Sequence, residues 1–133
     1  MGYFEKEGSS LVFRDNGETV MLTPWGENGL RVRSAILRDI GEERAALLEP
    51  SAGEGEILLG DNCASIRNGK ICAEFVIGGG VNVPQITFKN WEGKVLLQEI
   101  PSGGALERKA RYFRPLEGGT FSLKAGFLPV DGE

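Results

Sequence analysis

The residues best suited to chemistry in this sequence are two tryptophans, Trp25 and Trp91, which stand in the glycine-containing runs PWG and NWEG. An exposed aromatic ring in a loop can stack on a sugar ring through its apolar face and can donate a hydrogen bond from its ring N–H. Such a ring equally often packs over the ends of β-sheets or against a partner domain. The two positions are therefore candidates either for sugar stacking or for a domain interface.

Histidine is absent, which excludes several kinds of active site within the chain. Ser-His-Asp and Cys-His catalysis need an imidazole base, and two cysteines without histidine cannot complete the usual four-ligand zinc site. The glycine-rich runs GEG and GGG lack the strand-to-helix context of a dinucleotide-binding motif. We therefore expect no catalytic residues, no metal and no cofactor in this chain.

Charged residues form a weaker set of candidates. Basic side chains gather in two groups, at Arg31, Arg33 and Arg38 and at Arg108, Lys109, Arg111 and Arg114. Such groups can hold an anion, but they more often form the solvated face of a strand. Acidic side chains are scattered through predicted loops, at Asp39, Glu42, Glu43, Glu49, Glu54 and Glu56. A catalytic carboxylate pair needs a set spacing across the substrate, which a sequence alone cannot show.

The elements that position these residues are short β-strands. Glycine supplies 20 of 133 residues, about twice its average share, and turn signals separate the apolar runs. Nine or ten strands at this spacing are typical of an antiparallel β-sandwich or barrel. The segment 40–49 is either one short helix or a loop. The predicted strands lie at residues 11–14, 19–23, 30–36 (with Arg31 and Arg33 on the outer face), 57–59, 63–77 (a hairpin), 83–88, 94–99, 110–113 and 121–127.

The clearest turn signal is Asn68-Gly69, which predicts a two-residue type I′ turn. This turn would pair Arg67 with Lys70 and would direct alternate apolar residues of both strands toward the core. Cys63 and Cys72 would then lie on the outer face as diagonal neighbours. We therefore expect two free thiols rather than a disulfide.

Length and charge limit the remaining possibilities. A chain of 133 residues suits a single domain, residues 1–133. The net charge of −4 disfavours binding to nucleic acid or to an anionic membrane. No apolar run reaches the length of a transmembrane helix, and the polar N-terminus lacks a signal-peptide core. We expect a cytoplasmic protein. The sequence leaves open whether the chain forms a homo-oligomer.

Four segments resemble, in order, parts of glycoside hydrolase family 31. Residues 23–33 (TPWGENGLRVR) are similar to the family's early strand pair, and the hairpin at residues 68–70 is similar to its central hairpin. Residues 86–99 (ITFKNWEGKVLLQE) are similar to the next hairpin. Residues 120–123 with 127–133 are similar to the last segment before the barrel.

The resemblance implies an N-terminal β-sandwich of the galactose-mutarotase-like supersandwich type. In family 31 this domain packs on a (β/α)8 barrel that hydrolyses α-glycosidic bonds with retention, and the barrel supplies both catalytic aspartates. The chain would then be an excised, non-catalytic N-terminal domain, inactive alone, of an enzyme similar to an α-glucosidase or α-xylosidase. Its partners would be the barrel of the same polypeptide and, through the barrel, a carbohydrate substrate.

The resemblance also implies one loop that shapes the sugar pocket, here residues 98–104. Some family members have an aspartate followed by hydroxyl residues at this place, whereas this chain has Gln98, Glu99 and Ile100. These three residues are the substrate-loop candidates, with Gln98 or Glu99 available to hydrogen-bond a sugar hydroxyl. Two alternatives remain: a stand-alone carbohydrate-binding module that uses Trp25 or Trp91, and a structural interaction domain.

Overall fold

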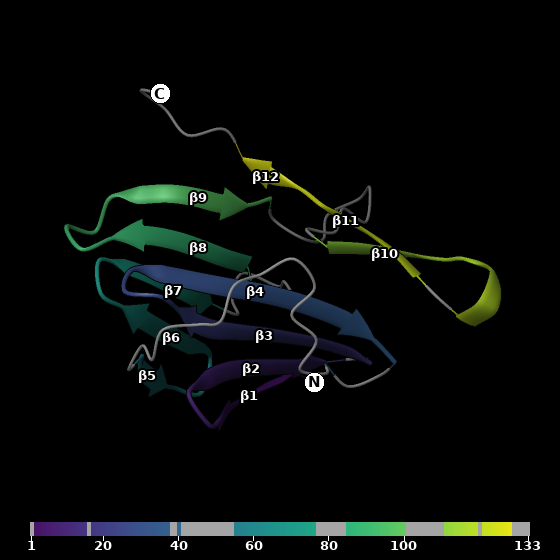
Figure 1. Cartoon of the computed structure of the whole chain (residues 1–133), viewed down its shortest axis with the longest axis horizontal. Coiled ribbons are helices and arrows are strands. Elements are labelled where there is room, and N and C mark those ends of the chain that lie inside the picture. Colours follow the sequence, from purple (N-terminus) through teal and green to yellow (C-terminus); the bar gives the residue numbers. More distant parts are fainter. Residues whose placement is uncertain are drawn as a thin grey trace.

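Twelve β-strands and one 3₁₀ turn make up the part of the chain that this computed structural model describes. No helix in that part is long and apolar enough to cross a membrane. The strands form two main antiparallel sheets and one separate pair (Figure 1). The described residues are 2–15, 17–37, 40, 55–76, 85–100, 111–119 and 121–128.

The first sheet is a four-stranded meander in which each strand pairs with the next. Its second hairpin is tight, because Asp15 pairs with Glu18, and Gly17 supplies a positive φ of 84° between them. Strand β1 has no counterpart among the predicted strands. The members of the first sheet are β1 (Tyr3–Glu7), β2 (Ser10–Asp15), β3 (Glu18–Trp25) and β4 (Gly29–Ile36).

The second sheet has six strands in the order β12-β9-β8-β7-β6-β5. Its members are β5 (Glu56–Leu59), β6 (Cys63–Asn68), β7 (Ile71–Val76), β8 (Gln85–Asn90), β9 (Val95–Glu99) and β12 (Phe127–Leu128). The separate pair consists of β10 (Arg111–Pro115) and β11 (Phe121–Ala125), joined by the 3₁₀ turn Glu117–Gly119. Figure 1 shows this pair at one end of the two main sheets.

The core lies between the two main sheets. Phe4, Phe13 and Phe75 meet there with ring centroids 5.3 to 6.0 Å apart, so that aromatic rings from both sheets interlock. Burial of apolar side chains from both inner faces is the main stabilising term of such a sandwich. The predicted all-β, antiparallel β-sandwich is confirmed. The buried core residues are Leu11, Phe13, Val20 and Leu22 from the first sheet and Ala64, Ile66, Ala73, Phe75 and Ile86 from the second.

The turn of the β6–β7 hairpin lies one residue later than predicted, which moves the partner of each strand residue by two positions. Asn68 pairs with Ile71, so the turn residues are Gly69 and Lys70, and the predicted pairing of Arg67 with Lys70 is wrong. Gly69 has a φ of 60°, as the first central residue of a type II′ turn requires. The reason is tertiary: the buried side-chain Nδ2 of Asn68 donates hydrogen bonds to two backbone carbonyls of the β3–β4 turn, which draws Asn68 into the strand.

The two cysteines are separated by this register. Cys63 lies opposite Val76 and Cys72 lies opposite Arg67, so the predicted diagonal arrangement of the thiols is wrong. Both thiols are free, with Cys63 exposed and Cys72 buried.

Other strand predictions are confirmed, with boundaries that differ by one or two residues. The predicted run 57–59 becomes Glu56–Leu59, the weak run 110–113 becomes Arg111–Pro115, and the alternating run 121–127 divides into β11 and β12. The described strands exceed the predicted nine or ten. Most of the segment 40–49, and five of the six scattered carboxylates, lie outside the described residues.

Candidate functional site

The three substrate-loop candidates lie at the end of β9, where alternate residues point to opposite faces of the second sheet. Gln98 is half-buried and pairs with Thr87 and Leu128 on the neighbouring strands. Glu99 faces the other way, toward the first sheet, and only 3 % of it is exposed. Glu99 is therefore directed into the molecule, and Gln98 lies on the outer face.

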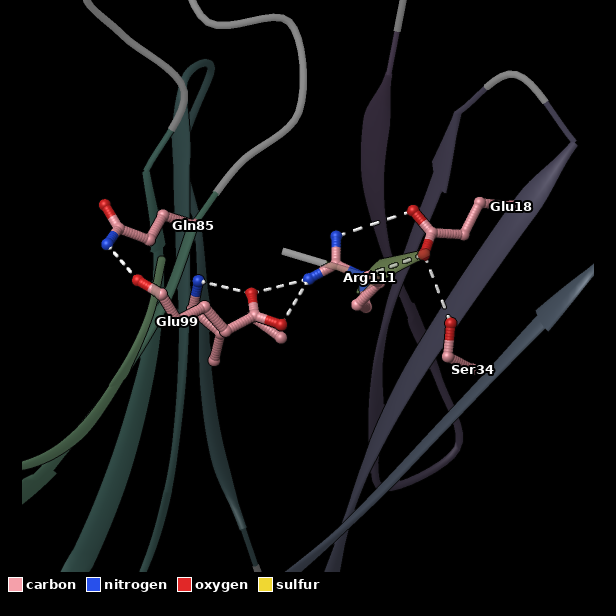
Figure 2. A network of polar contacts seen from close by, with 6 residues as sticks. Glu18, Ser34, Gln85, Glu99 and Arg111 are labelled. Atoms are coloured by element: carbon pink, nitrogen blue, oxygen red, sulfur yellow. Dashed lines mark hydrogen bonds and ion pairs between the residues drawn. The ribbon is translucent and has the colours of Figure 1, made fainter. Parts of the chain in front are cut away.

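Glu99 belongs to a buried charge bridge, formed by Glu18, Arg111 and Glu99 (Figure 2). Arg111 Nη1 lies 2.5 and 2.7 Å from the two carboxylate oxygens of Glu99. Arg111 Nε lies 2.8 Å from Oε2 of Glu18, which also accepts a hydrogen bond of 3.2 Å from Ser34 Oγ. The bridge thus connects β3 and β4 of the first sheet, through β10, to β9 of the second.

The electrostatics of the charge bridge favour permanent ion pairing. The side chains of Arg111 and Glu99 are each 4 % exposed, and that of Glu18 is 14 % exposed. Burial of the guanidinium acts to lower the pKa of Arg111, but hydrogen bonds and charge from Glu18 and Glu99 outweigh it and raise the pKa. Both carboxylates accept hydrogen bonds from Arg111. The charge bridge is therefore better suited to fixing the strands relative to one another than to transferring a proton.

Three further contacts fix the end of β9. Ile86 N–H donates to Glu99 Oε1 at 3.0 Å, and the Gln85 side-chain amide donates to the Glu99 backbone carbonyl. One residue later, Ile100 N–H donates to the carbonyl of Gly126 at 3.1 Å. The side chain of Ile100 also packs so closely on Gly126 that a Cβ there would lie 3.0 Å from Ile100 Cδ1. The backbone around the candidates is therefore closely anchored.

A cleft of about 450 Å³ opens beside the charge bridge, between β4 and the strands β9, β11 and β12. Its lining is mostly apolar; Glu99 and Arg111 are its charged members, and Ser34 adds a hydroxyl. Several apolar side chains of the lining are 39–46 % exposed, namely Val32, Leu96, Leu97, Leu123 and Phe127. An open apolar surface of this kind marks a place where another part of a protein, or a ligand, makes contact.

The two tryptophans differ in exposure. Trp25 ends β3, is half-buried, and has the guanidinium of Arg31 stacked 5.0 Å from its ring centroid. Trp91 is 59 % exposed in the β8–β9 turn. Hydrogen bonds fix the conformation of that turn: Asn90 Oδ1 accepts hydrogen bonds from the backbone N–H groups of Glu92 and Lys94, each at 2.9 Å. Trp91 is therefore the tryptophan with a freely presented ring.

Comparison with known proteins gives matches to one family, although no family model matches the chain. The chain is 29 % identical over 145 aligned positions to an uncharacterized family 31 glucosidase, ORF2, of Pseudescherichia vulneris. It also superposes on the crystal structure of a family 31 α-xylosidase from a soil metagenome, complexed with xylose, with a TM-score of 0.82 and 28 % identity. The resemblance to glycoside hydrolase family 31 is confirmed.

The family 31 matches cover nearly all of this chain but little of each larger protein. The glucosidase alignment covers 96 % of the chain and 26 % of the glucosidase. The α-xylosidase alignment covers 97 % of the chain and 21 % of the α-xylosidase. The chain thus corresponds to a domain-sized part of a larger family 31 protein.

Three of the four segments that carry the family 31 resemblance lie at hairpins of this fold, and most of the fourth, residues 120 and 129–133, lies outside the described residues. The run 23–33 forms the β3–β4 turn and the run 86–99 forms the β8–β9 hairpin. The sugar-contacting roles of Gln98, Glu99 and Ile100 stay predictions. For Glu99 the charge bridge supplies another role, because its carboxylate is already occupied.

The charge bridge contains two residues that were not recognised as a pair from the sequence. Arg111 was grouped with a basic cluster, in which Arg114 is exposed and Arg108 and Lys109 lie outside the described residues. Glu18 lies just before the predicted strand 19–23, whereas in the structure it begins β3. The two residues are 93 positions apart in the chain, and no local spacing connects them.

Proposed function

We propose that this chain is the non-catalytic N-terminal β-sandwich of a retaining α-glycosidase of the α-glucosidase or α-xylosidase type. In this proposal it braces the catalytic barrel of the same polypeptide and contributes residues to the carbohydrate pocket. The observation that carries the proposal is the extent of the matches: almost the whole chain aligns with only 21–26 % of larger family 31 proteins. The remaining three quarters of such a protein would contain the barrel.

The open apolar surface supports the bracing role. Leu123 and Phe127 are 45 % and 44 % exposed, and they line the cleft from β11 and β12, which follow each other in the chain. Apolar side chains gathered in this way lose little by facing a second domain and gain about 25 cal/mol for each Å² removed from water. We therefore assign the cleft rim, formed by β9, β11 and β12, to the contact with the barrel.

The end of β9 supports the second role. Gln98 has an amide that can both donate to and accept from sugar hydroxyls, and it lies on the face of the sheet opposite the buried Glu99. In this proposal Gln98 makes the polar contact and Ile100 forms an apolar wall. Glu99 acts through its position rather than by touching the sugar.

The first experiment compares the 133-residue chain with the product of the complete reading frame that contains it. Both are assayed on 4-nitrophenyl α-D-xylopyranoside and 4-nitrophenyl α-D-glucopyranoside. We expect hydrolysis only by the longer protein, because this chain has no histidine and no recognised carboxylate pair. Hydrolysis by the chain alone, or a longer protein inactive on both substrates, would overturn the proposal.

The bracing role is tested in the longer protein by Phe127→Glu at the cleft rim. A charge buried against the barrel is costly, so we expect a lower melting temperature and loss of activity. Leu58→Glu is the matched control, because Leu58 is 64 % exposed on β5, at the opposite edge of the second sheet. Equal effects of the two substitutions would contradict an interface at the rim.

A second candidate function is a stand-alone carbohydrate-binding module, favoured by the exposure of Trp91 at 59 %. It predicts heat on titrating the chain with α-linked disaccharides. Trp91→Ala would abolish the heat, and Trp25→Ala would preserve it, because the Trp25 ring is already stacked with Arg31. A panel of such sugars without measurable heat would remove this candidate.

A further inference from the structure

We infer that Arg111 is a positioning residue that fixes the end of β9 relative to the first sheet. Glu18 of the first sheet orients Arg111 by an ion pair. Gln98 and Ile100 flank Glu99 on this strand end, so the same bridge sets the place of both. The consequence for sugar binding rests on the proposed function. The positioning of the β9 end by Arg111 is independent of the proposed function.

The β8–β9 ladder does not by itself hold this strand end. Its register shifts between Phe88 and Lys89, and its last pair joins Thr87 to Gln98. One position further, Ile86 N–H bonds to the Glu99 side chain at 3.0 Å instead of to a backbone carbonyl of β9. The Glu99 carboxylate therefore replaces a rung of the ladder, and its location decides where the strand ends.

The location of that carboxylate depends on Arg111. A carboxylate that is 4 % exposed needs a cation and hydrogen bonds to be stable there. Arg111 provides two contacts, at 2.5 and 2.7 Å. Within the described part of the chain, the other side of the β9 end pairs with β12, a strand of two residues. Without Arg111 the Glu99 carboxylate would turn toward water, and its hydrogen bond from the Ile86 N–H would be lost.

Arg111 is in turn oriented from the first sheet. Its Nε contacts Glu18 Oε2 at 2.8 Å, and Ser34 Oγ holds the same oxygen at 3.2 Å. Figure 2 shows the continuous path from Ser34 through Glu18, Arg111 and Glu99 to the backbone of β8. An arginine suits this place because its planar fork can bond two carboxylates on different edges at once.

The test measures amide hydrogen exchange in the 133-residue chain with Arg111→Met, which keeps an unbranched apolar stem and removes the charged guanidinium group. A general loss of stability would accelerate exchange throughout, so the control is Leu11→Ala, a variant of the buried core on β2 of the first sheet, chosen for a similar loss of stability. We expect the amides of Ile86 and Ile100 to exchange at least tenfold faster in Arg111→Met than in the control. Equal rates would overturn the inference.

Arg111→Lys provides a second variant if Arg111→Met does not fold. Lysine keeps the charge but cannot bond Glu18 and Glu99 with a planar fork. Its stability loss is matched by the milder core variant Leu11→Val, on β2 of the first sheet. We expect faster exchange at Ile100 in Arg111→Lys than in that control, by at least threefold. Rates that agree within error would overturn the inference here also.

The consequence for sugar is measured in the longer protein on the two 4-nitrophenyl glycosides. We expect Arg111→Met to raise KM at least fivefold and to change kcat per folded molecule less than twofold. The matched control is Glu74→Gln, which removes an exposed ion pair of 3.0 Å with Lys89 in the same sheet. An unchanged KM would overturn this consequence. A wild-type protein inactive on both glycosides would instead refute the proposed function, and hydrogen exchange would still decide the positioning role.

Discussion

Replacement of Asn68 by aspartate tests how two hairpin turns of the sandwich are joined. The buried side-chain Nδ2 of Asn68 donates to the carbonyls of Gly26 and Gly29 at 3.0 and 2.7 Å. In return, Asn28 Oδ1 accepts the backbone N–H of Lys70 at 2.8 Å. The β3–β4 turn and the β6–β7 turn are thus joined by two asparagines with opposite roles, one a donor and one an acceptor.

The expected cost follows from these contacts. Asn68→Asp keeps the size of the side chain but replaces a two-hydrogen donor with a carboxylate that can only accept. Loss of each hydrogen bond to a half-buried carbonyl costs about 1–3 kcal/mol, so the two together cost about 2–6 kcal/mol. Asn68 is only 3 % exposed, and water cannot easily replace the lost donors. This cost is a large part of the roughly 5–15 kcal/mol that stabilises a typical domain.

Asn28→Asp is the matched control, because the same chemical change there preserves the acceptor that Lys70 N–H uses. Asn28 is exposed, and surface changes of this kind usually stay within about 0.5 kcal/mol. Both variants are unfolded with urea at pH 7 and followed by tryptophan fluorescence and circular dichroism. Equal midpoints for the two variants, at unchanged m-values, would refute the roles assigned to the two asparagines.

Three further predictions concern stability and thiol reactivity. Arg111→Met leaves the largely buried carboxylates of Glu18 and Glu99 without a cation and should lower the free energy of unfolding by about 3–5 kcal/mol. Glu18→Gln leaves the ion pair of Arg111 with Glu99 in place and should lower it by about 1–3 kcal/mol. Both are measured by urea unfolding. Phe75→Ala opens a cavity in the core and should cost about 3–5 kcal/mol in the same assay. Ellman's reagent at pH 8 should label the exposed Cys63 at once and the buried Cys72 only on unfolding. Burial, and then the charge of Glu74, raise the pKa of Cys72 above 9.0, so its contribution to stability is complete below pH 9 and declines above it.

Each of these predictions has an outcome that contradicts it. A larger loss in Glu18→Gln than in Arg111→Met would mean that the excess negative charge does not govern the stability of the bridge. Phe75→Ala should be compared with Val76→Ala, since Val76 is 56 % exposed on the same strand; similar losses would contradict the assigned core. Two thiols that react at the same rate in the folded protein would contradict the burial of Cys72.

The strands and their faces could be predicted largely from sequence because they depend on local chemistry. Alternation of apolar and polar residues at 30–36 and 121–127, and turn residues at fixed intervals, determine where a strand begins and which side faces the core. Strand β1 is not evident in the sequence because charged residues occupy its last three positions, although Phe4 packs on Phe13. A single apolar anchor in a short strand gives no periodic signal.

The tertiary structure decided what depends on residues far apart in the chain. The Asn-Gly signal identified the β6–β7 turn, but carbonyls about 40 positions away drew Asn68 into the strand and shifted the register. The resemblance to family 31 likewise identified Glu99 as a candidate, and the structure places it at the end of β9. Only the packing of the two sheets surrounds that carboxylate with Arg111 and Ile86, because burial and charge pairing are properties of the assembled sheets and not of a local pattern.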